Sequence, residues 1–190
     1  CFMGLYQPFM KLWMGEDLLL PFSVVVLLCV YFWIYEYIMM ASVYKDAGGI
    51  WHQDRFRPLI SGVLNLAFNL FTVKFIGLYG IVLSTIVSMA IVSAPWITTN
   101  IFKIIFKRNP VKYVSKLCYY AFSAVVATFL SYNTVNLITV DGWIGLILKA
   151  LVCITISSVI MLMLFFKIDE FAGAVSLVKR MLHLKNKQSK

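Results

Sequence analysis

Charged residues are scarce in this chain, and acidic residues are the scarcest of them. Only 13% of the 190 residues are charged, with 17 lysines and arginines against 8 acids. A soluble domain carries about a quarter of its residues as charged ones. The chain therefore has too little polar surface to cover a globule in water, whereas its 62% of hydrophobic residues suits a helix bundle in lipid. We expect an all-α integral membrane protein.

The sequence also lacks the short motifs that mark common enzymes. No GxGxxG or GxxxxGK pattern offers a phosphate cradle, and no HExxH or GxSxG pattern marks a hydrolase. His52 and Asp54 provide only two ligand side chains in one loop, so we interpret them as solvent-exposed polar residues. The cysteines have no spacing for zinc or a redox pair. We predict no catalytic residue, no metal and no cofactor, and a transporter, channel or scaffold rather than an enzyme.

Long hydrophobic runs are what the sequence has in abundance. A helix that crosses the hydrocarbon core needs roughly 20 mostly apolar residues. Five runs approach or meet that length: Leu18–Val43, Pro58–Val73, Leu78–Ile97, Leu117–Leu137 and Trp143–Phe166. We interpret Cys1–Trp13 as the end of a further helix whose beginning is absent. The sequence thus predicts about five complete spans plus a truncated one, followed by a basic tail over residues 167–190.

The basic residues predict the orientation of these spans, because lysine and arginine accumulate in cytoplasmic loops. When the connections between the five runs are assigned alternately to two sides, all but three of the 17 basic residues fall on one side. The exceptions are Lys11, Lys74 and Lys149. We therefore expect the loops near residues 51 and 107 and the C-terminus to face the cytoplasm. The aromatic residues lie inside the hydrophobic runs, so we expect no nucleic-acid partner. Attraction to anionic lipids of the inner leaflet is enough to explain the basic face, so we expect membrane lipids as partners.

Glu36 is the only acidic residue inside a predicted span, and it lies among several aromatic residues that include Tyr35. An ionisable group in the hydrocarbon region is costly and is by default a functional candidate. A carboxylate bordered by aromatic rings suits sugar binding or proton coupling. Alternatively, Glu36 lies close enough to Lys45 to be hydrated at the inner interface, with the tyrosines forming an interfacial belt. Both interpretations remain open from the sequence.

Asn65 and Asn69 are the polar residues of the second predicted span, and their spacing places them on one face of a helix. They are candidates for lining a hydrophilic substrate pathway together with Glu36 and Tyr35. The alternative is that their amides form hydrogen bonds with a neighbouring helix, as amides buried in membranes commonly do. We favour the second interpretation. Ser84 and Ser88 continue a face of small residues along the next span, which favours close helix packing.

The order of several short segments resembles that of a known transporter family. Tyr44–Trp51 leads to Asp54–Leu59, then to Asn65 and Asn69, and on to Lys74–Ile81. Pro8–Gly15 upstream and Ala94–Trp96 downstream fit the same pattern. Together these segments, over residues 1–116, resemble the C-terminal half of Wzx-type polysaccharide repeat-unit flippases. Those proteins belong to the superfamily of multidrug, oligosaccharidyl-lipid and polysaccharide exporters. The cytoplasmic loop motif of this pattern consists of Tyr44, Asp46, Gly48, Arg55 and Arg57.

The resemblance implies a fold of two lobes around a central cavity, in the cytoplasmic membrane of a bacterium. Residues 1–116 would hold helices of the second lobe, and residues 117–166 two peripheral spans. The implied activity is the transfer of undecaprenyl-diphosphate-linked oligosaccharide units across the membrane for surface polysaccharides such as capsule or O-antigen. The lipid-linked oligosaccharide would be the substrate, with other polysaccharide assembly proteins as further partners.

Three other functions fit parts of the sequence. A multidrug exporter of the same superfamily would use Glu36 for coupling to a cation. A membrane-embedded glycan polymerase or ligase would be expected to carry its reactive groups in a sizeable external loop, whereas the external connections near residues 74–77 and 138–142 are very short. A scaffold without transport activity would not account for the ordered family pattern.

Overall fold

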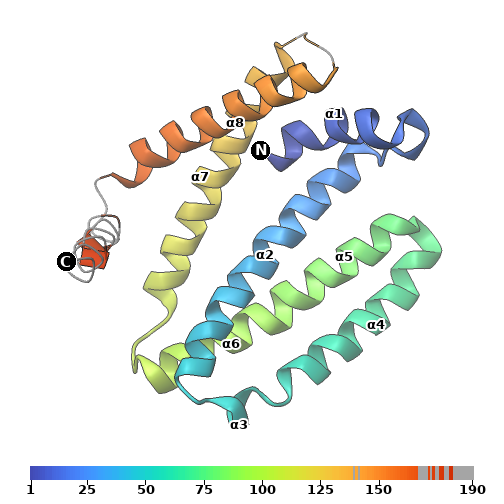
Figure 1. Ribbon diagram of the computed structural model, residues 1–190. Coiled ribbons are helices and arrows are strands. Elements are labelled where there is room, and N and C mark those ends of the chain that lie inside the picture. The colour runs from blue at the N-terminus through green and yellow to red at the C-terminus, as the bar shows by residue number, and fades with distance from the viewer. Residues whose placement is uncertain are drawn as a thin grey trace, which may run out of the picture. The chain divides into compact units, whose positions relative to one another are not determined.

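The structure is a computed structural model that describes residues 1–138, 140 and 142–166, together with positions 171, 173, 176, 177, 180 and 181 of the tail. Every regular element in these residues is a helix (Figure 1). Five helical stretches are long and apolar enough to cross a membrane. The predicted all-α membrane fold is therefore confirmed, and the chain is a multi-pass membrane protein. The predicted basic tail, 167–190, lies largely outside the described residues.

The helices follow one another with short connections, as Figure 1 shows. The α-helices are α1 (Phe2–Met14), α2 (Phe22–Ala47), α3 (Trp51–Asp54), α4 (Arg57–Ile76), α5 (Leu78–Ser88), α6 (Ala94–Asn100), α7 (Val111–Asn136) and α8 (Gly142–Phe165). A 3-10 turn, η1 (Glu16–Leu18), precedes α2, and two π-helical turns, η2 (Met89–Ser93) and η3 (Ile101–Ile105), flank α6. The five spans are α2, Trp51–Ile76, Leu78–Ile105, α7 and α8.

All five predicted spans are present, but the ends of several differ from the prediction. The first begins at Phe22 rather than Leu18, because Leu18 belongs to the η1 turn and Pro21 interrupts the apolar run. Gly15 has φ 88° before the η1 turn, and Pro21 is extended before α2. Lys11 and Glu16 form an exposed ion pair across this connection, with Nζ and Oε1 2.5 Å apart. The hydrogen bond and the positive charge of Lys11 lower the pKa of the Glu16 carboxyl.

The third span is longer than predicted, since it continues past Ile97 to Ile105. The expected end followed Pro95, which has no N–H to donate to the carbonyl of Ile91 and whose ring would clash with it in a regular α-helix. The structure accommodates Pro95 by widening the preceding turn into the π-helical η2. The helix therefore passes the proline without ending, and it ends only after the second π-helical turn, η3.

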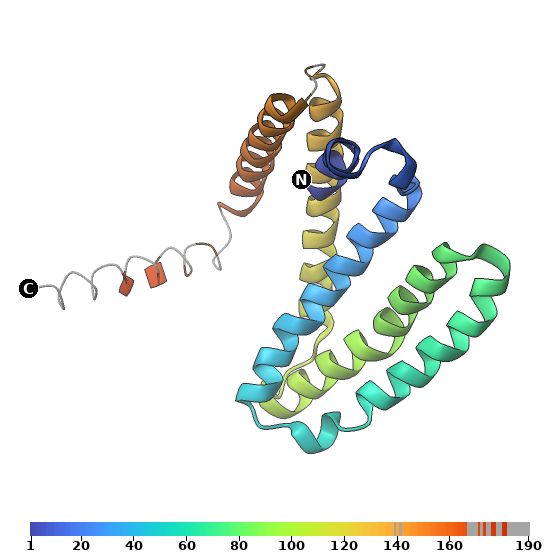
Figure 2. The same cartoon turned by 45° about the vertical axis from the view of Figure 1, so that its right-hand side comes forward.

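The chain forms two compact units. The hairpin unit comprises Phe2 and Phe9–Cys118, and the terminal unit comprises Cys1, Met3–Pro8 and Tyr119–Lys190. Within the terminal unit, α7 and α8 are antiparallel (Figure 2) and joined by a hydrogen bond between the Ser131 and Ser157 hydroxyls, 3.1 Å long. The Tyr120 and Phe165 rings meet at the other end of this pair, with centroids 5.2 Å apart. The assignment of residues 117–166 as peripheral spans stays a prediction.

Within the hairpin unit, α4 and α5 lie side by side and antiparallel in both views (Figures 1 and 2). Gly77 makes the reversal with φ 53°, a conformation that residues with a Cβ rarely adopt. Three residues later, Gly80 lies against the backbone of Thr72. A Cβ placed on Gly80 would come within 2.7 Å of the Thr72 carbonyl carbon. The absence of a side chain at Gly80 therefore permits the close approach of the two helices.

Substituting Gly80 with alanine should loosen the α4–α5 hairpin. The added methyl overlaps the Thr72 backbone, and overpacking of this kind costs about 1–3 kcal/mol. We expect a lower thermal unfolding midpoint for purified Gly80→Ala protein in detergent. Gly62→Ala in α4 is the matched control, because a Cβ there meets nothing within 4 Å and alanine favours helix formation. A destabilisation by Gly62→Ala as large as that by Gly80→Ala would contradict the close approach.

Candidate functional site

Four charged side chains gather where α2 turns through α3 into α4. We call Lys45, Asp46, Asp54 and Arg57 the charge clamp. The Lys45 ammonium lies 2.9 Å from Asp46 Oδ1 and 3.4 Å from Asp54 Oδ2. The Arg57 guanidinium donates two hydrogen bonds to the Asp54 carboxylate, from Nε to Oδ1 (2.7 Å) and from Nη2 to Oδ2 (3.0 Å). Asp54 thus holds a cation from α2 and a cation from α4 at once.

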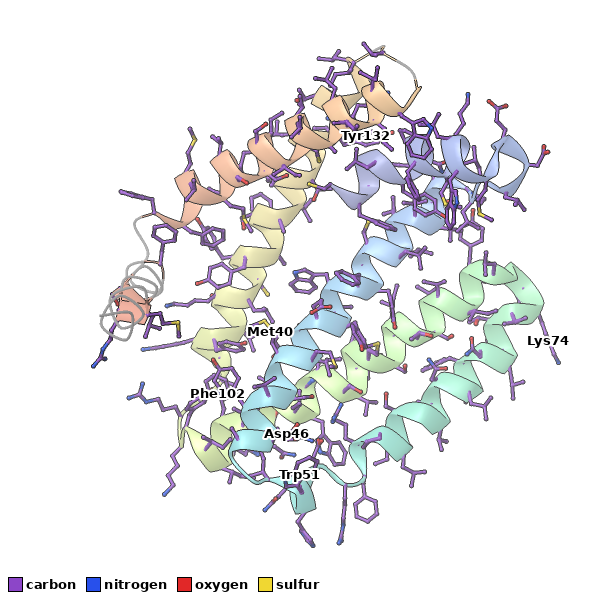
Figure 3. All side chains as sticks on the ribbon, viewed as in Figure 1. Met40, Asp46, Trp51, Lys74, Phe102 and Tyr132 are labelled. Carbon is purple, nitrogen blue, oxygen red and sulfur yellow. The ribbon has the colours of Figure 1, made fainter. Side chains whose placement is uncertain are left out.

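The centre of the clamp, Lys45 and Asp54, is withdrawn from solvent. Lys45 is 7% exposed and Asp54 5% exposed, although both carry charges that are costly to bury without a partner. Lys45 Nζ also lies 4.2 Å from the centre of the Trp51 ring, so the ring face contributes a cation–π attraction. Figure 3 shows Asp46 and Trp51 together at this end of α2. Each charged group in the cluster therefore has a partner of opposite charge. The bidentate pair of Arg57 with Asp54 is a contact of the strongest kind between such groups.

The same corner is attached to the third span. Ile50 packs with Ile97 and Ile101 in a buried apolar cluster. The Trp96 indole and the Asn100 amide both donate hydrogen bonds to the Gln53 carbonyl, at 3.2 and 3.4 Å. The charge clamp therefore closes a corner that is already packed on α6. This arrangement fixes the relative positions of α2, α4 and α6 at one end of the hairpin unit.

The predicted cytoplasmic loop motif lies at this corner, but its members have different surroundings. Asp46 and Arg57 belong to the charge clamp. The Arg55 guanidinium instead lies 3.0 Å from His52 Nε2 and over the Phe56 ring. Tyr44 is exposed, with its ring 6.4 Å from that of Phe106. A Cβ on Gly48 would lie 3.0 Å from Ile105 Cγ1, which explains a glycine there.

Lys45 and Asp54 were not among the predicted site residues, although they are the buried centre of the clamp. One available signal was the pair of opposite charges on either side of Gly48 and Gly49. A reversal at this glycine pair brings its flanks together, and Gly49 has φ 65°. Burial of the two charges, however, depends on the approach of α6, which the local sequence does not encode.

A second polar feature runs along the contact of α4 with α5 and η2, and we call it the polar seam. The Asn65 amide donates to Thr85 Oγ1 (3.0 Å) and to Ser88 Oγ (3.3 Å). The Asn69 amide donates to Asn65 Oδ1 (3.0 Å), and the Ser84 hydroxyl donates to Asn69 Oδ1 (2.6 Å). Each of these half-buried asparagines thus bonds across the hairpin.

Hydroxyl groups extend the polar seam at both ends. The Thr72 hydroxyl donates to the Gly80 carbonyl (3.1 Å), and the Ser93 hydroxyl donates to Ser61 Oγ (3.0 Å). Ser84 and Ser88 are almost fully buried. Hydrogen bonds between membrane helices contribute about 1 kcal/mol each. Asn65 and Asn69 therefore have a packing role in the structure, and their place in a substrate pathway stays a prediction.

Glu36 lies near the middle of α2. This helix has 26 residues and is about 39 Å long at 1.5 Å per residue, so Glu36 lies within one turn of its midpoint. It also lies about 13 Å along the axis from Lys45, whereas half the hydrocarbon core is about 15 Å thick. Counted along the helix, the carboxylate therefore lies near the middle of α2. Its depth in the membrane, and the choice between a cavity and an interfacial position, stay predictions.

The Glu36 side chain is exposed on the surface of the hairpin unit. Among the described residues, it forms no hydrogen bond or ion pair. The helical repeat places it on one stripe of α2 with the exposed side chains of Phe32, Met40 and Val43; Met40 is labelled on α2 in Figure 3. We call these four residues the acidic stripe, after Glu36, which is the one acidic residue among them. The hairpin unit itself does not cover the acidic stripe, in contrast to the charge clamp.

The tyrosines beside Glu36 divide between two faces of α2. Tyr35 is partly exposed and stacks on Tyr31, with ring centroids 5.9 Å apart. The Tyr37 hydroxyl forms a hydrogen bond with Thr98 Oγ1 of α6. The face of α2 that carries Tyr37 therefore contacts the third span. Glu36, a further 100° around the helix, is directed away from that contact.

Neither polar feature has the composition of a metal or cofactor site. Among the residues that the structure describes, no group of three histidine, cysteine or acidic side chains is placed to hold a metal ion. Every buried side-chain nitrogen or oxygen in that part of the chain has a hydrogen-bond partner. No protein-family profile, no curated protein and no solved structure matches the chain.

Removing the charge of Asp54 should destabilise the protein strongly. Asp54→Asn leaves Lys45 and Arg57 buried without their shared carboxylate, and breaking a buried pair costs about 3–5 kcal/mol. We expect a large fall in the thermal unfolding midpoint in detergent. The matched control is Asp46→Asn, because the Asp46 side chain is 46% exposed and such pairs contribute about 0–1 kcal/mol. Equal effects of the two substitutions would show that the clamp is not anchored on Asp54.

Proposed function

We propose that this chain is part of a polysaccharide repeat-unit flippase. It would move undecaprenyl-diphosphate-linked oligosaccharides from the inner to the outer leaflet of a bacterial cytoplasmic membrane. The observation that carries the proposal is Glu36, a carboxylate near the middle of α2 that its own unit leaves exposed. The ordered segments from Tyr44 to Ile81, with their resemblance to Wzx-type flippases, support the same function.

The energetics of Glu36 support a hydrated pathway next to the acidic stripe. A charged side chain at the centre of a membrane helix costs about 2.5–3.5 kcal/mol. Contact with water or with the polar groups of a passing substrate removes most of that cost. Exposed aromatic side chains on α2, such as Tyr35 and Trp33, suit the apolar faces of sugar rings. Glu36 and Tyr35 would then bind glycan hydroxyl groups during transfer.

The remaining polar features would give the transporter a rigid moving part. A two-lobed transporter works by rocking one group of helices against another around a fixed site. The charge clamp and the polar seam tie α2, α4, α5 and α6 together at several points. In this proposal Asn65 and Asn69 preserve the shape of the lobe, and the acidic stripe of α2 faces the substrate.

The acidic stripe also supports a second candidate, a cation-coupled multidrug exporter. In that case Glu36 would bind the coupling cation, and aromatic side chains would contact a hydrophobic drug. A glycan polymerase or ligase is less well supported, because α4 and α5 are joined through Gly77 alone. A connection of that length leaves no room between α4 and α5 for a loop with reactive groups.

Glu36→Gln, introduced into the chromosomal gene that encodes this chain, should lower surface polysaccharide export several-fold while protein abundance stays nearly unchanged. Glutamine retains the volume and the hydrogen-bonding capacity of glutamate but removes its charge, so the substitution tests charge rather than packing. Export is measured as surface polysaccharide per cell at matched protein level.

Glu36→Leu is the companion variant, because it also removes polarity. We expect it to abolish export. Wild-type export by the Gln variant would assign Glu36 to an interfacial role and remove the main support for the flippase. Unchanged export combined with lost resistance to cationic drugs would favour the multidrug exporter.

The proposed orientation can be tested by labelling single cysteines in intact cells. In a background with Cys1, Cys29, Cys118 and Cys153 replaced by alanine, a membrane-impermeant thiol reagent should label Val140→Cys from outside. It should label Asn109→Cys only after lysis, because the connection around Asn109 carries five basic residues and no acid. Labelling of position 109 in intact cells would reverse the orientation.

A further inference from the structure

The connection between the third and fourth spans carries an unusual concentration of positive charge. Five cations lie between η3 and the first turns of α7, and we call them the basic junction: Lys103, Lys107, Arg108, Lys112 and Lys116. No acidic residue occurs in the sequence between Asp54 and Asp141. The basic junction therefore has no counter-charge on its own spans, and all five residues are exposed.

The basic junction differs in this respect from three other cations of the hairpin unit. Lys11, Lys45 and Arg57 each form an ion pair with a carboxylate. By contrast, Lys103, Lys107, Arg108 and Lys112 form no ion pair with any described residue. Asp46 and Asp54 are both engaged in the charge clamp. Any anion that neutralises these four cations therefore comes from outside the described part of the chain.

Aromatic contacts hold the two sides of the basic junction together. The Phe102 ring of η3 lies 4.9 Å from the Tyr113 ring of α7 and 5.3 Å from the Phe106 ring, measured between centroids. Figure 3 shows Phe102 where the third span ends, close to α2. Phe106 and Tyr113 remain partly exposed. Aromatic side chains of this kind favour the level of the lipid headgroups.

The backbone of the connection is also ordered. The Arg108 amide donates to the Phe102 carbonyl (3.0 Å), and the Asn109 side chain accepts a hydrogen bond from the Val111 amide (3.0 Å). Lys107 adopts φ 49°, a conformation that non-glycine residues rarely maintain unless their surroundings determine it. Lys107 and Arg108 therefore extend from a turn held by hydrogen bonds, and Lys103 and Lys112 extend from the helices on either side of it.

We infer that the basic junction binds the phosphodiester headgroups of anionic glycerophospholipids. Clusters of four to eight lysines and arginines next to a membrane span suit such headgroups. The positive-inside rule requires basic residues on this side of the membrane, but it does not require four cations without an ion pair, Lys103, Lys107, Arg108 and Lys112, next to exposed aromatic rings. The inference rests on the hairpin unit alone and is independent of the transported substrate.

The test uses the purified full-length protein in a zwitterionic detergent. Phosphatidylglycerol or phosphatidylcholine is titrated in, and bound lipid is counted by native mass spectrometry. Each basic residue near a headgroup contributes about fivefold in affinity, so the wild type should bind phosphatidylglycerol at least tenfold more tightly than phosphatidylcholine. The preference should weaken as salt is raised.

The decisive variant replaces Lys103, Lys107, Arg108 and Lys112 with glutamine and should lose the preference for phosphatidylglycerol. A matched control replaces Lys179, Lys185, Lys187 and Lys190 with glutamine, which removes the same charge from the tail, and should retain it. Circular dichroism of each variant checks that the helices are intact. An unchanged preference in the junction variant, or an equal loss in the tail variant, would overturn the inference.

A competition experiment distinguishes the bilayer lipid from a lipid diphosphate. Geranyl diphosphate, a short-chain prenyl diphosphate, is added at the same concentration as phosphatidylglycerol. We expect it to displace less than half of the bound phosphatidylglycerol from the wild type. Displacement of nearly all of it, at equal concentration, would assign the basic junction to a diphosphate headgroup and overturn its assignment to the bilayer.

Discussion

The hairpin unit depends on one buried carboxylate. Asp54 receives a bidentate hydrogen bond from Arg57 and lies 3.4 Å from the Lys45 ammonium. Both cations are mostly withdrawn from water. Loss of the Asp54 carboxylate would leave Arg57 without an ionic partner and Lys45 with Asp46 alone. The carboxylate thus couples the end of α2 to the start of α4, and the adjacent Gln53 carbonyl couples both to α6. The polar seam then continues the attachment of α4 along α5.

The charged and polar groups of the hairpin unit differ in whether they have an interaction partner within the unit. Charges at the corner are paired within the chain, and the asparagines of the seam are bonded across the hairpin. Glu36 and four cations of the basic junction, Lys103, Lys107, Arg108 and Lys112, form no ion pair with a described residue. We propose that groups from outside the unit (water, substrate or lipid) supply the missing interaction at both places.

Much of the fold was predictable because a membrane span is a strong, local signal. Hydrophobic length alone predicted five spans in the correct order, and only their ends shifted. The third span shows why: Pro95 favours a helix end locally, whereas a π-helical turn allows the helix to continue.

The candidate site was less predictable from the sequence. Glu36 was identified from its position alone. The prediction that Asp54 is solvent-exposed was wrong, whereas His52 is exposed as expected. The burial of Lys45 was not predicted, because the packing of this corner on α6 involves residues distant in sequence. The amides of Asn65 and Asn69 were compatible with either a pathway or a helix contact, and only the positions of Thr85, Ser88 and Ser84 show where their hydrogen bonds go.

The central claim is that the acidic stripe of α2 faces water rather than lipid. Nitroxide spin labels at Phe32, Met40 and Val43, with one at Ile38 as a buried reference, allow a direct test in reconstituted bilayers. The three stripe positions should be relaxed more strongly by a water-soluble nickel chelate than by dissolved oxygen, and Ile38 should be shielded from both. Dominant relaxation by oxygen at the stripe positions would place them in lipid and contradict the account.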